Sequence, residues 1–424
     1  MQNTDSFFEG FGAFIAASPS SYHAAAEAAR LLTEDAGFTA LAEDAAWPTA
    51  AGRYLVVRDG AIIAWVRPES AGVTTPVRVL GAHTDSPGFK LKPSPTTGSD
   101  GWLQAGVEVY GGPLLNSWLD REIELAGRLV LRDGSEHLVR TGPYLRIPQL
   151  AIHLDREANS GLTLDRQRHT QPVYGVGDLA QADVLGHLAG LAGVAAEDVA
   201  GYDILTADTQ EPRRFGRDRE LFAAGRMDNL SSVYAALRAL IDLPQDPTEI
   251  VMLAAFDHEE LGSETRSGAS GPFLADVINR IYDGLGSNAE DVARALARSW
   301  CLSADAGHSV HPNYGERHDS KNRPLAGSGP LLKINANQRY ATDAHGAALF
   351  SAACRAAGVD YQDFVSNNTV PCGSTIGPLT ATRLGIRTVD VGIPLLSMHS
   401  ARELCHVNDP IALSSAIGAF YAGA

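Results

Sequence analysis

The most constraining feature of the sequence is an apolar run, Ile250–Phe256, that ends just before a cluster of acidic residues. The run predicts a buried strand. Two adjacent carboxylates, Glu259 and Glu260, follow the end of that strand. Adjacent residues of an extended chain point in opposite directions, so the two side chains are able to take different roles. One can bind a metal ion while the other accepts a proton.

The same alternation of strand and helix recurs on both sides of this run. Further strands are predicted at Val77–Gly81, Trp300–Ala304 and Thr388–Ile393. The predicted helices are Tyr22–Leu32, Leu230–Leu240, Ser270–Gly284, Asn288–Ser299, Thr342–Ala357, Thr375–Leu384 and Pro410–Tyr421. This alternation indicates an α/β fold in which helices flank a central mixed sheet.

A different pattern interrupts the alternation in the middle of the chain. Pro93–Gly101 is rich in residues that break regular structure, and short strands such as Glu122–Leu131 and His137–Arg140 follow it. Gly and Pro recur there at short spacing, which is typical of a β-rich unit. We therefore expect a discontinuous α/β domain, residues 1–92 and 225–424, with an inserted β-rich domain, residues 93–224.

The composition excludes two classes of partner and indicates a compartment. A formal net charge of -16, from 34 basic and 50 acidic residues, argues against nucleic acid and anionic membranes. Four cysteines without a C-x-x-C pair suggest reduced thiols. The stretch Met1–Gly10 lacks the pattern of a signal peptide, and no apolar run approaches the ~18 residues of a membrane span. We expect a cytoplasmic protein.

Several metal-binding residue types fall just after predicted strands or just before helices. They are His83, Asp85, Asp228, Glu259, Glu260, Asp305 and His399. Ligand sites of open α/β sheets lie at the carboxyl ends of the strands, so these residues can converge. Histidines and carboxylates suit Zn²⁺, and a pair of ions needs three or four carboxylates. Taken singly, each residue has an ordinary structural interpretation, such as a helix cap or a solvated turn.

Taken together and in order, the motifs resemble the aspartyl aminopeptidase family of co-catalytic zinc exopeptidases. The matching segments are Gly81–Pro87, Gly225–Asn229, Phe256–Ser263, Ser303–Asp305, Pro371–Pro378 and Leu396–Glu403. The resemblance implies two Zn²⁺ per subunit, with Mn²⁺ or Co²⁺ as alternative ions. The ligands that it implies are His83 and Asp305 for one ion, Glu260 and His399 for the other, and Asp228 as the bridge.

The resemblance also implies roles in catalysis. Glu259 corresponds to the general base that takes a proton from the metal-activated water, and Asp85 supports the imidazole of His83 from behind. His258 departs from the family pattern, in which many relatives have asparagine next to the base. His308 and His311 lie close to Asp305 in the sequence, but the family does not use them as ligands, so we expect them to be structural.

Two further residues bear on substrate and assembly. Lys333 matches a segment that binds the acidic side chain of the substrate's first residue, because a carboxylate in a partly desolvated pocket needs a cation. His153 matches a histidine that reaches the active site of a neighbouring subunit. The implied activity is removal of one N-terminal Asp or Glu from peptides. The implied assembly is a homo-oligomer built from dimers, up to a dodecamer, with the inserted domain forming the dimer.

Two alternatives stay open at this point. The chain could be a dimetal aminopeptidase or deacylase for neutral substrates, or a non-catalytic assembly scaffold. The set of carboxylates argues against a scaffold, because a scaffold has no need for unpaired charges around an empty site.

Overall fold

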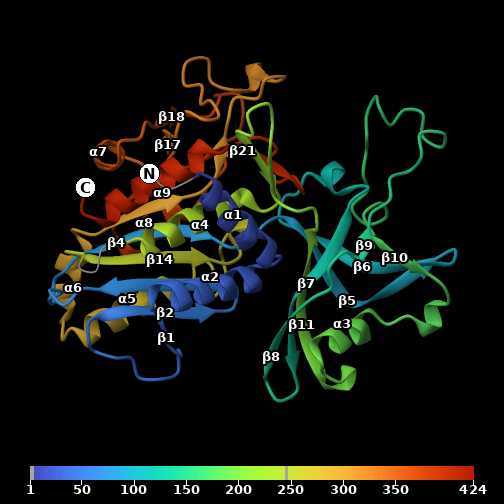
Figure 1. Ribbon diagram of the computed structural model, residues 1–424, viewed down its shortest axis with the longest axis horizontal. Coiled ribbons are helices and arrows are strands. Elements are labelled where there is room, and N and C mark those ends of the chain that lie inside the picture. Colours follow the sequence, from blue (N-terminus) through green and yellow to red (C-terminus); the bar gives the residue numbers. More distant parts are fainter. Residues whose placement is uncertain (1–3, 244–246) are drawn as a thin grey trace.

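A nine-stranded mixed sheet forms the larger half of the computed structural model, which describes residues 4–243 and 247–424 (Figure 1). Residues 1–3 of the N-terminal stretch considered above lie outside the described residues. In spatial order the strands are β1 (Thr39–Ala40), β2 (Gly52–Arg58), β3 (Ala61–Arg67), β14 (Ile250–Phe256), β4 (Val77–His83), β15 (Trp300–Ala304), β19 (Arg387–Gly392), β17 (Leu331–Lys333) and β18 (Gln362–Phe364).

The four central strands, β14, β4, β15 and β19, are parallel, whereas β3 and β17 pair antiparallel with their outer members. A hairpin that turns at Asp59-Gly60 joins β2 and β3, which pair antiparallel from Gly52 opposite Arg67 to Arg58 opposite Ala61. All seven residues of β14 are buried, as the apolar run indicated. The central mixed sheet expected from the sequence is therefore confirmed.

Helices cover both faces of this sheet. One face is covered by α1 (Thr4–Ala17), α2 (Ser21–Ala36), α4 (Met227–Ile241), α7 (Ala344–Ala357) and α9 (Asn408–Tyr421), and the other by α5 (Phe273–Gly284), α6 (Ala289–Leu296) and α8 (Ile376–Leu384). The strands supply both cores because alternate side chains point to opposite faces. In β3, Ile62 packs in one core and Ile63 in the other.

Most predicted helices agree with the structure within a few residues, and α2 shows why. Ser20 caps its first turn by accepting the amide of His23, and Gly37 ends it at a φ of 67°. The helix α1 was not predicted. Its signal was present as Phe7, Phe11 and Phe14, whose spacing places one apolar face against the core.

A second, seven-stranded sheet stands beside the first (Figure 1). Its strands, in spatial order, are β11 (Val199–Asp208), β5 (Gly88–Ser99), β6 (Trp102–Tyr110), β10 (Val173–Val176), β9 (Leu145–Arg146), β7 (Glu122–Leu131) and β8 (Glu136–Arg140). The helix α3 (Val184–Ala192) packs against it around a separate core that includes Phe89, Leu125 and Ile204. The separate β-rich unit is thus confirmed, whereas its boundaries at 93 and 224 stay a prediction.

Two small sheets are present beside the two large ones. The strand β21 (Glu403–His406) pairs with β13 (Leu221–Ala224), which pairs in turn with β12 (Arg213–Phe215). A two-stranded sheet joins β16 (Gly307–His308) to β20 (Pro394–Leu395). Within the described residues, no helix combines the length and apolarity that crossing a membrane requires.

Candidate metal centre

The carboxyl ends of the parallel strands meet at one edge of the nine-stranded sheet. His83 is the last residue of β4, and it lies in register with Phe256, the last residue of β14. Asp305 directly follows β15, and Glu260 lies in the short 3₁₀ turn η4 (Glu259–Leu261) after β14. This edge is where open α/β sheets bind ligands.

Five of the predicted residues form a compact cluster there. His83 Nε2 lies 3.3 Å from Asp228 Oδ1 and 3.5 Å from Asp305 Oδ1. His399 Nε2 lies 3.3 Å from Asp228 Oδ2 and 3.4 Å from Glu260 Oε1. The two oxygens of Asp228 thus face different histidines. The structure therefore brings together two triads that share one aspartate.

The chemistry of this cluster fits bound divalent cations. Within the described part of the chain, Asp228 Oδ1 and Glu260 Oε1 are buried without a hydrogen-bond partner. Burial raises the pKa of Glu259 to about 8 and that of Glu260 well above its ordinary value. Buried carboxylates with raised pKa values lack sufficient positive charge around them. Nitrogen and oxygen ligands in this number suit zinc, whose charge would stabilise the ionised carboxylates.

The pKa values of the two histidines are raised as well, which for an imidazole favours the charged form. Burial acts to lower the pKa of His399, but the hydrogen bond with Asp228 and the charge of Glu260 raise it to about 10. Burial likewise opposes ionisation of His83, yet Asp228 and Asp305 raise its pKa well above the ordinary value. Asp228 is buried, but His399 and His83 lower its pKa. The two imidazoles thus favour the ionised form of the shared aspartate.

Asp85 lies directly behind the cluster. Its Oδ1 accepts the backbone amide of Glu259 at 3.0 Å, and its Oδ2 accepts that of Glu260 at 3.2 Å. His83 Nδ1 lies 3.0 Å from the backbone oxygen of Asp85 and 3.4 Å from Oδ1. Asp85 thus supports both the imidazole and the acidic turn, and the second contact was not anticipated from the sequence.

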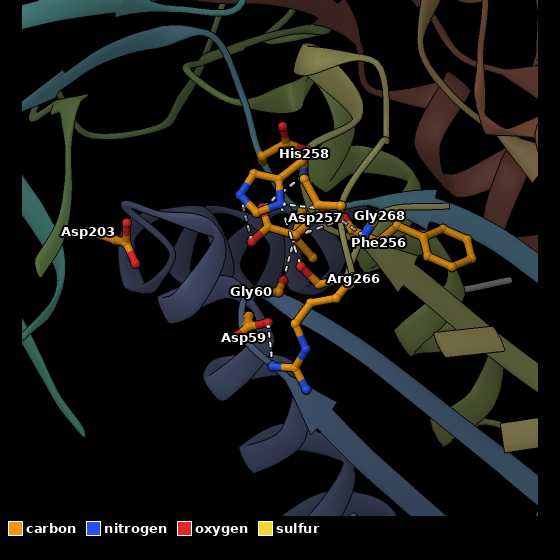
Figure 2. A network of polar contacts seen from close by, with 12 residues as sticks. Asp59, Gly60, Asp203, Phe256, Asp257, His258, Arg266 and Gly268 are labelled. Carbon is orange, nitrogen blue, oxygen red and sulfur yellow. Dashed lines mark hydrogen bonds and ion pairs between the residues drawn. The ribbon is translucent and has the colours of Figure 1, made fainter. Parts of the chain in front are cut away.

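His258, the departure beside the predicted base, has its side chain in a network of polar contacts (Figure 2). Its Nδ1 lies 3.0 Å from Thr265 Oγ1, and its Nε2 lies 3.7 Å from Asp257 Oδ2. The residue has a φ of 62°, a conformation that asparagine adopts more readily than histidine. In the same network Arg266 forms an ion pair with Asp59, 3.1 Å apart.

Lys333, at the end of β17, is 1% exposed and reaches the cluster from the side. Its Nζ donates to the backbone oxygen of Ala306 at 2.8 Å and lies 3.6 Å from Asp305 Oδ2. The ring of Tyr340 lies 5.3 Å from the same Nζ. A buried cation therefore stands next to one of the predicted metal ligands.

His153, His308 and His311, which the sequence analysis singled out, are not among the residues of the described cluster. His153 is exposed in the long loop between β9 and β10, which extends from the second sheet away from the first (Figure 1). His153 therefore does not reach the metal cluster of its own chain. His308 packs edge-on against Phe364, and His311 lies against Tyr314, 4.9 Å between ring centres.

Two further residues contact this site, although the sequence analysis assigned them no role. Glu403 is buried and accepts the backbone amides of Asp228 and His399, each at 3.0 Å. Tyr110, from the second sheet, donates its hydroxyl to Asp85 Oδ2 at 2.9 Å. Glu403 is the last residue of the matching segment Leu396–Glu403, so the sequence offered a reason to consider it. Nothing in the sequence pairs Tyr110 with Asp85.

Comparisons with known proteins agree with this geometry. A family model described as Aminopeptidase I zinc metalloprotease (M18) matches residues 14–421. A probable M18 family aminopeptidase 2 of Streptomyces avermitilis is 54% identical over 416 residues, covering 97% of this chain and 96% of its own.

Solved structures are similar over nearly the whole chain. A chain of the cryo-EM structure of the Ape4 and Nbr1 complex has a TM-score of 0.94 and 33% identity, covering 99% of this chain and 86% of its own. The S. cerevisiae mApe1 dodecamer matches with a TM-score of 0.85 and 29% identity, over 98% of this chain and 96% of the matched one. The family resemblance drawn from the motifs is confirmed: the chain belongs to the M18 family of aminopeptidase I zinc metalloproteases.

Proposed function

We propose that this zinc aminopeptidase removes a single acidic residue, Asp or Glu, from the N-terminus of peptides. The observation that supports this specificity is Lys333, a buried cation 3.6 Å from Asp305 Oδ2. A buried ammonium needs an anionic partner, and Asp305 faces His83 as well as Lys333. A substrate carboxylate that enters beside the cluster would give the Lys333 ammonium a second anionic partner.

The proposed centre holds two ions. His83 and Asp305 would hold one, Glu260 and His399 the other, and Asp228 would serve both, since its two oxygens face the two histidines. When bound, zinc supplies Lewis-acid chemistry, which polarises a peptide carbonyl and makes water acidic enough to react near neutral pH.

Within this centre, Glu259 is the proposed general base. Its backbone amide is held by Asp85, which fixes the turn. Its side-chain oxygen lies within 4.8 Å of ligand atoms of His83 and Glu260. In the proposed sequence, the Glu259 carboxylate takes a proton from the attacking water and returns it to the departing amine. A pKa raised toward neutral pH suits this double role, because the carboxylate becomes a stronger base for the first step and its protonated form can still give up the proton in the second.

Lys333→Met tests the specificity. The substitution keeps the length of the side chain and removes the charge. We expect kcat/KM on Asp- and Glu-amides to fall about a hundredfold, as for a lost charged pairing in a binding site, while Leu- and Ala-amides change little. Lys90→Met, which breaks a half-buried ion pair with Asp203 in the second sheet, is the control. An equal loss on all substrates would instead support the neutral aminopeptidase.

Glu259→Gln tests the base. Activity on every substrate should fall by about 10²–10⁴-fold, the usual contribution of a general base. The zinc content should stay at two ions per chain, because Glu259 is not a proposed ligand. Full activity in a variant that retains its zinc would remove Glu259 from this role, and a chain without zinc after gentle purification would favour the scaffold.

We also propose that the protein is a cytoplasmic homo-oligomer in which His153 acts in the site of a neighbouring subunit. Exposed apolar side chains surround it in the loop, including Leu150 and Leu154, the latter 75% exposed. Apolar exposure of this kind marks contact surfaces. The mApe1 match is itself a dodecamer.

Subunit complementation tests this arrangement. Glu259→Gln and His153→Ala are each expected to be nearly inactive as pure oligomers. In a mixed dimer, one site would combine an intact Glu259 with an intact His153 of the other variant. Equal mixing after dissociation should therefore restore about a quarter of wild-type activity, given random pairing in a twofold dimer. If mixed oligomers form but activity does not return, His153 does not act in the site of the neighbouring subunit.

A further inference from the structure

The second sheet contributes a short segment, Tyr110–Leu114, that touches the metal centre at several points. β6 ends at Tyr110, and the next three residues are Gly111, Gly112 and Pro113. The segment therefore leaves the second sheet at the place where the two sheets approach each other. Around the metal centre it contacts Asp85 after β4, the acidic turn after β14 and the loop that contains His399.

The first contact is the hydroxyl of Tyr110. It is buried and donates to Asp85 Oδ2 at 2.9 Å, and the same oxygen accepts the amide of Glu260. A buried carboxylate is held firmly only when each of its oxygens has well-placed donors. Tyr110 therefore completes the environment of Asp85, which in turn fixes the turn that contains Glu259 and Glu260.

The second contact is the backbone of Gly111, which packs directly on Glu260. Gly111 has a φ of +66°, which favours glycine. A Cβ placed on Gly111 would lie 3.2 Å from Glu260 Cβ and 3.4 Å from the backbone oxygen of Glu260. Any larger residue would push Glu260 by a few tenths of an ångström, so the close approach requires glycine.

The third contact surrounds His399. Its Nδ1 lies 3.0 Å from the backbone oxygen of Gly112, and Leu114 donates its amide to the backbone oxygen of His399 at 2.9 Å. A carbonyl only accepts, so Nδ1 holds the proton and Nε2 is directed at Asp228 and Glu260. Hydrogen bonds of this kind fix the tautomer and orientation of metal-binding histidines.

We propose that Tyr110–Leu114 is a positioning element for one half of the metal centre, the half formed by Glu260 and His399. Through it, the second sheet sets the affinity of the ion held there. The ion held by His83 and Asp305 is affected less, because Tyr110 and Glu260 share Asp85 Oδ2, whereas His83 Nδ1 faces the backbone oxygen and Oδ1 of Asp85. The inference rests on the proposed assignment of ligands to two ions. None of these residues is proposed to touch the substrate.

Two pairs of variants test the inference by zinc binding rather than by activity. Tyr110→Phe removes the hydroxyl, and Tyr202→Phe, which removes a hydroxyl bound to the backbone of Lys92 in the same sheet, is its control. Gly111→Ala adds the methyl group that meets Glu260. Gly142→Ala is its control, because Gly142 also has a φ of +66° but its Cβ would meet none of the described atoms within 4 Å.

The measurement is competition for Zn²⁺ against a chromophoric chelator, which yields a dissociation constant for each ion. Tyr110→Phe and Gly111→Ala should each weaken one ion by about 10–100-fold, the usual effect of losing support behind a ligand, and leave the other nearly unchanged. The controls should bind both ions as the wild type does. Activity lost in Gly111→Ala should return at higher free zinc.

The result separates this inference from the proposed function. If the wild type binds only one zinc ion, the two-ion assignment fails, and this inference fails with it. If the wild type binds two ions but both affinities are unchanged in the variants, or fall equally, only the positioning role is overturned. Because Tyr110→Phe removes a single oxygen, it decides the matter even if Gly111→Ala does not fold.

Discussion

The two halves of the proposed metal centre are built by different means. His83 and Asp305 stand at the ends of β4 and β15, which are paired with strands on both sides in the middle of the sheet. Glu260 lies in a 3₁₀ turn, and His399 lies in a loop at a φ of 64°. The side chain of His83 is 2% exposed, against 32% for His399.

The difference shows what each half needs from the rest of the chain. A central strand fixes its last residue through the ladder of backbone hydrogen bonds. The half formed by His83 and Asp305, the strand half, therefore needs fewer contacts from elsewhere, such as that of Asp85 with His83. A loop has no such ladder, so the half formed by Glu260 and His399, the loop half, is held by individual contacts. Here these come from Asp85, Glu403 and Tyr110–Leu114, some of them across the two sheets. We therefore expect the strand half to hold its ion more tightly than the loop half.

Removing one histidine from each half is the strongest test of this asymmetry. His399→Ala should lose the weaker ion and keep the tighter one at nearly wild-type affinity. His83→Ala should lose the tighter ion and keep only the weaker one. The affinity of each damaged half should fall on the order of a hundredfold or more, because structural zinc sites share about 10–16 kcal/mol among about four ligands.

Equilibrium dialysis with metal analysis measures the outcome directly. Both variants should be nearly inactive, so activity does not distinguish them, whereas the affinity of the remaining ion does. The comparison is wrong if the ion left in His399→Ala is held no more tightly than the ion left in His83→Ala.

The strand half was also the part that the sequence predicted best. An apolar run followed by a polar residue places that residue at a sheet edge, and this reasoning applies to His83 and Asp305. In the loop half it reaches only the Glu259–Glu260 turn that follows β14. The contacts of the loop half are different in kind. Tyr110 and Asp85 belong to different sheets, and their approach depends on how those sheets pack. Local patterns report burial and periodicity, and they contain no information about such packing.

Glu403 contacts residues of both halves, so its substitution should reduce the difference in affinity between the two ions. Its Oε2 accepts the amide of Asp228, which serves both halves, and its Oε1 accepts that of His399. Glu403→Gln replaces one acceptor oxygen with an amide group, which would face a backbone N–H. We expect both ions to weaken, by about 10–100-fold for the loop half and less for the strand half.

The matched control for that variant is Glu124→Gln in the second sheet. Glu124 is also buried and accepts from Arg140 and from the amide of Gly142. Its loss should lower thermal stability without changing either zinc affinity, measured by the same chelator competition. If Glu403→Gln behaves like Glu124→Gln, Glu403 supports the fold rather than the metal centre.

The smallest expected effect lies outside both halves, at Asp409 near the start of α9. Its carboxylate accepts the amides of Gly327 and Gly329, and burial raises its pKa to about 7, from 3.8. Between these values the folded protein binds more protons at Asp409 than the unfolded chain does. This contribution to stability is therefore fully present below about pH 4 and is lost as the pH rises through about 7.

Asp409→Asn, which is neutral throughout, separates this effect from the metal centre. Relative to the variant, the wild type should lose a few degrees in Tm between pH 5 and pH 8, as expected for a change of a few kcal/mol in a protein of this size. Because Asp409 belongs to neither half, the difference between wild type and variant should be equal with and without zinc. Gly329 lies just before β17, which ends at Lys333. A Tm difference that depends on zinc would therefore show that the region around Asp409 is coupled to the metal centre. The two halves could then no longer be treated as independent of the rest of the fold.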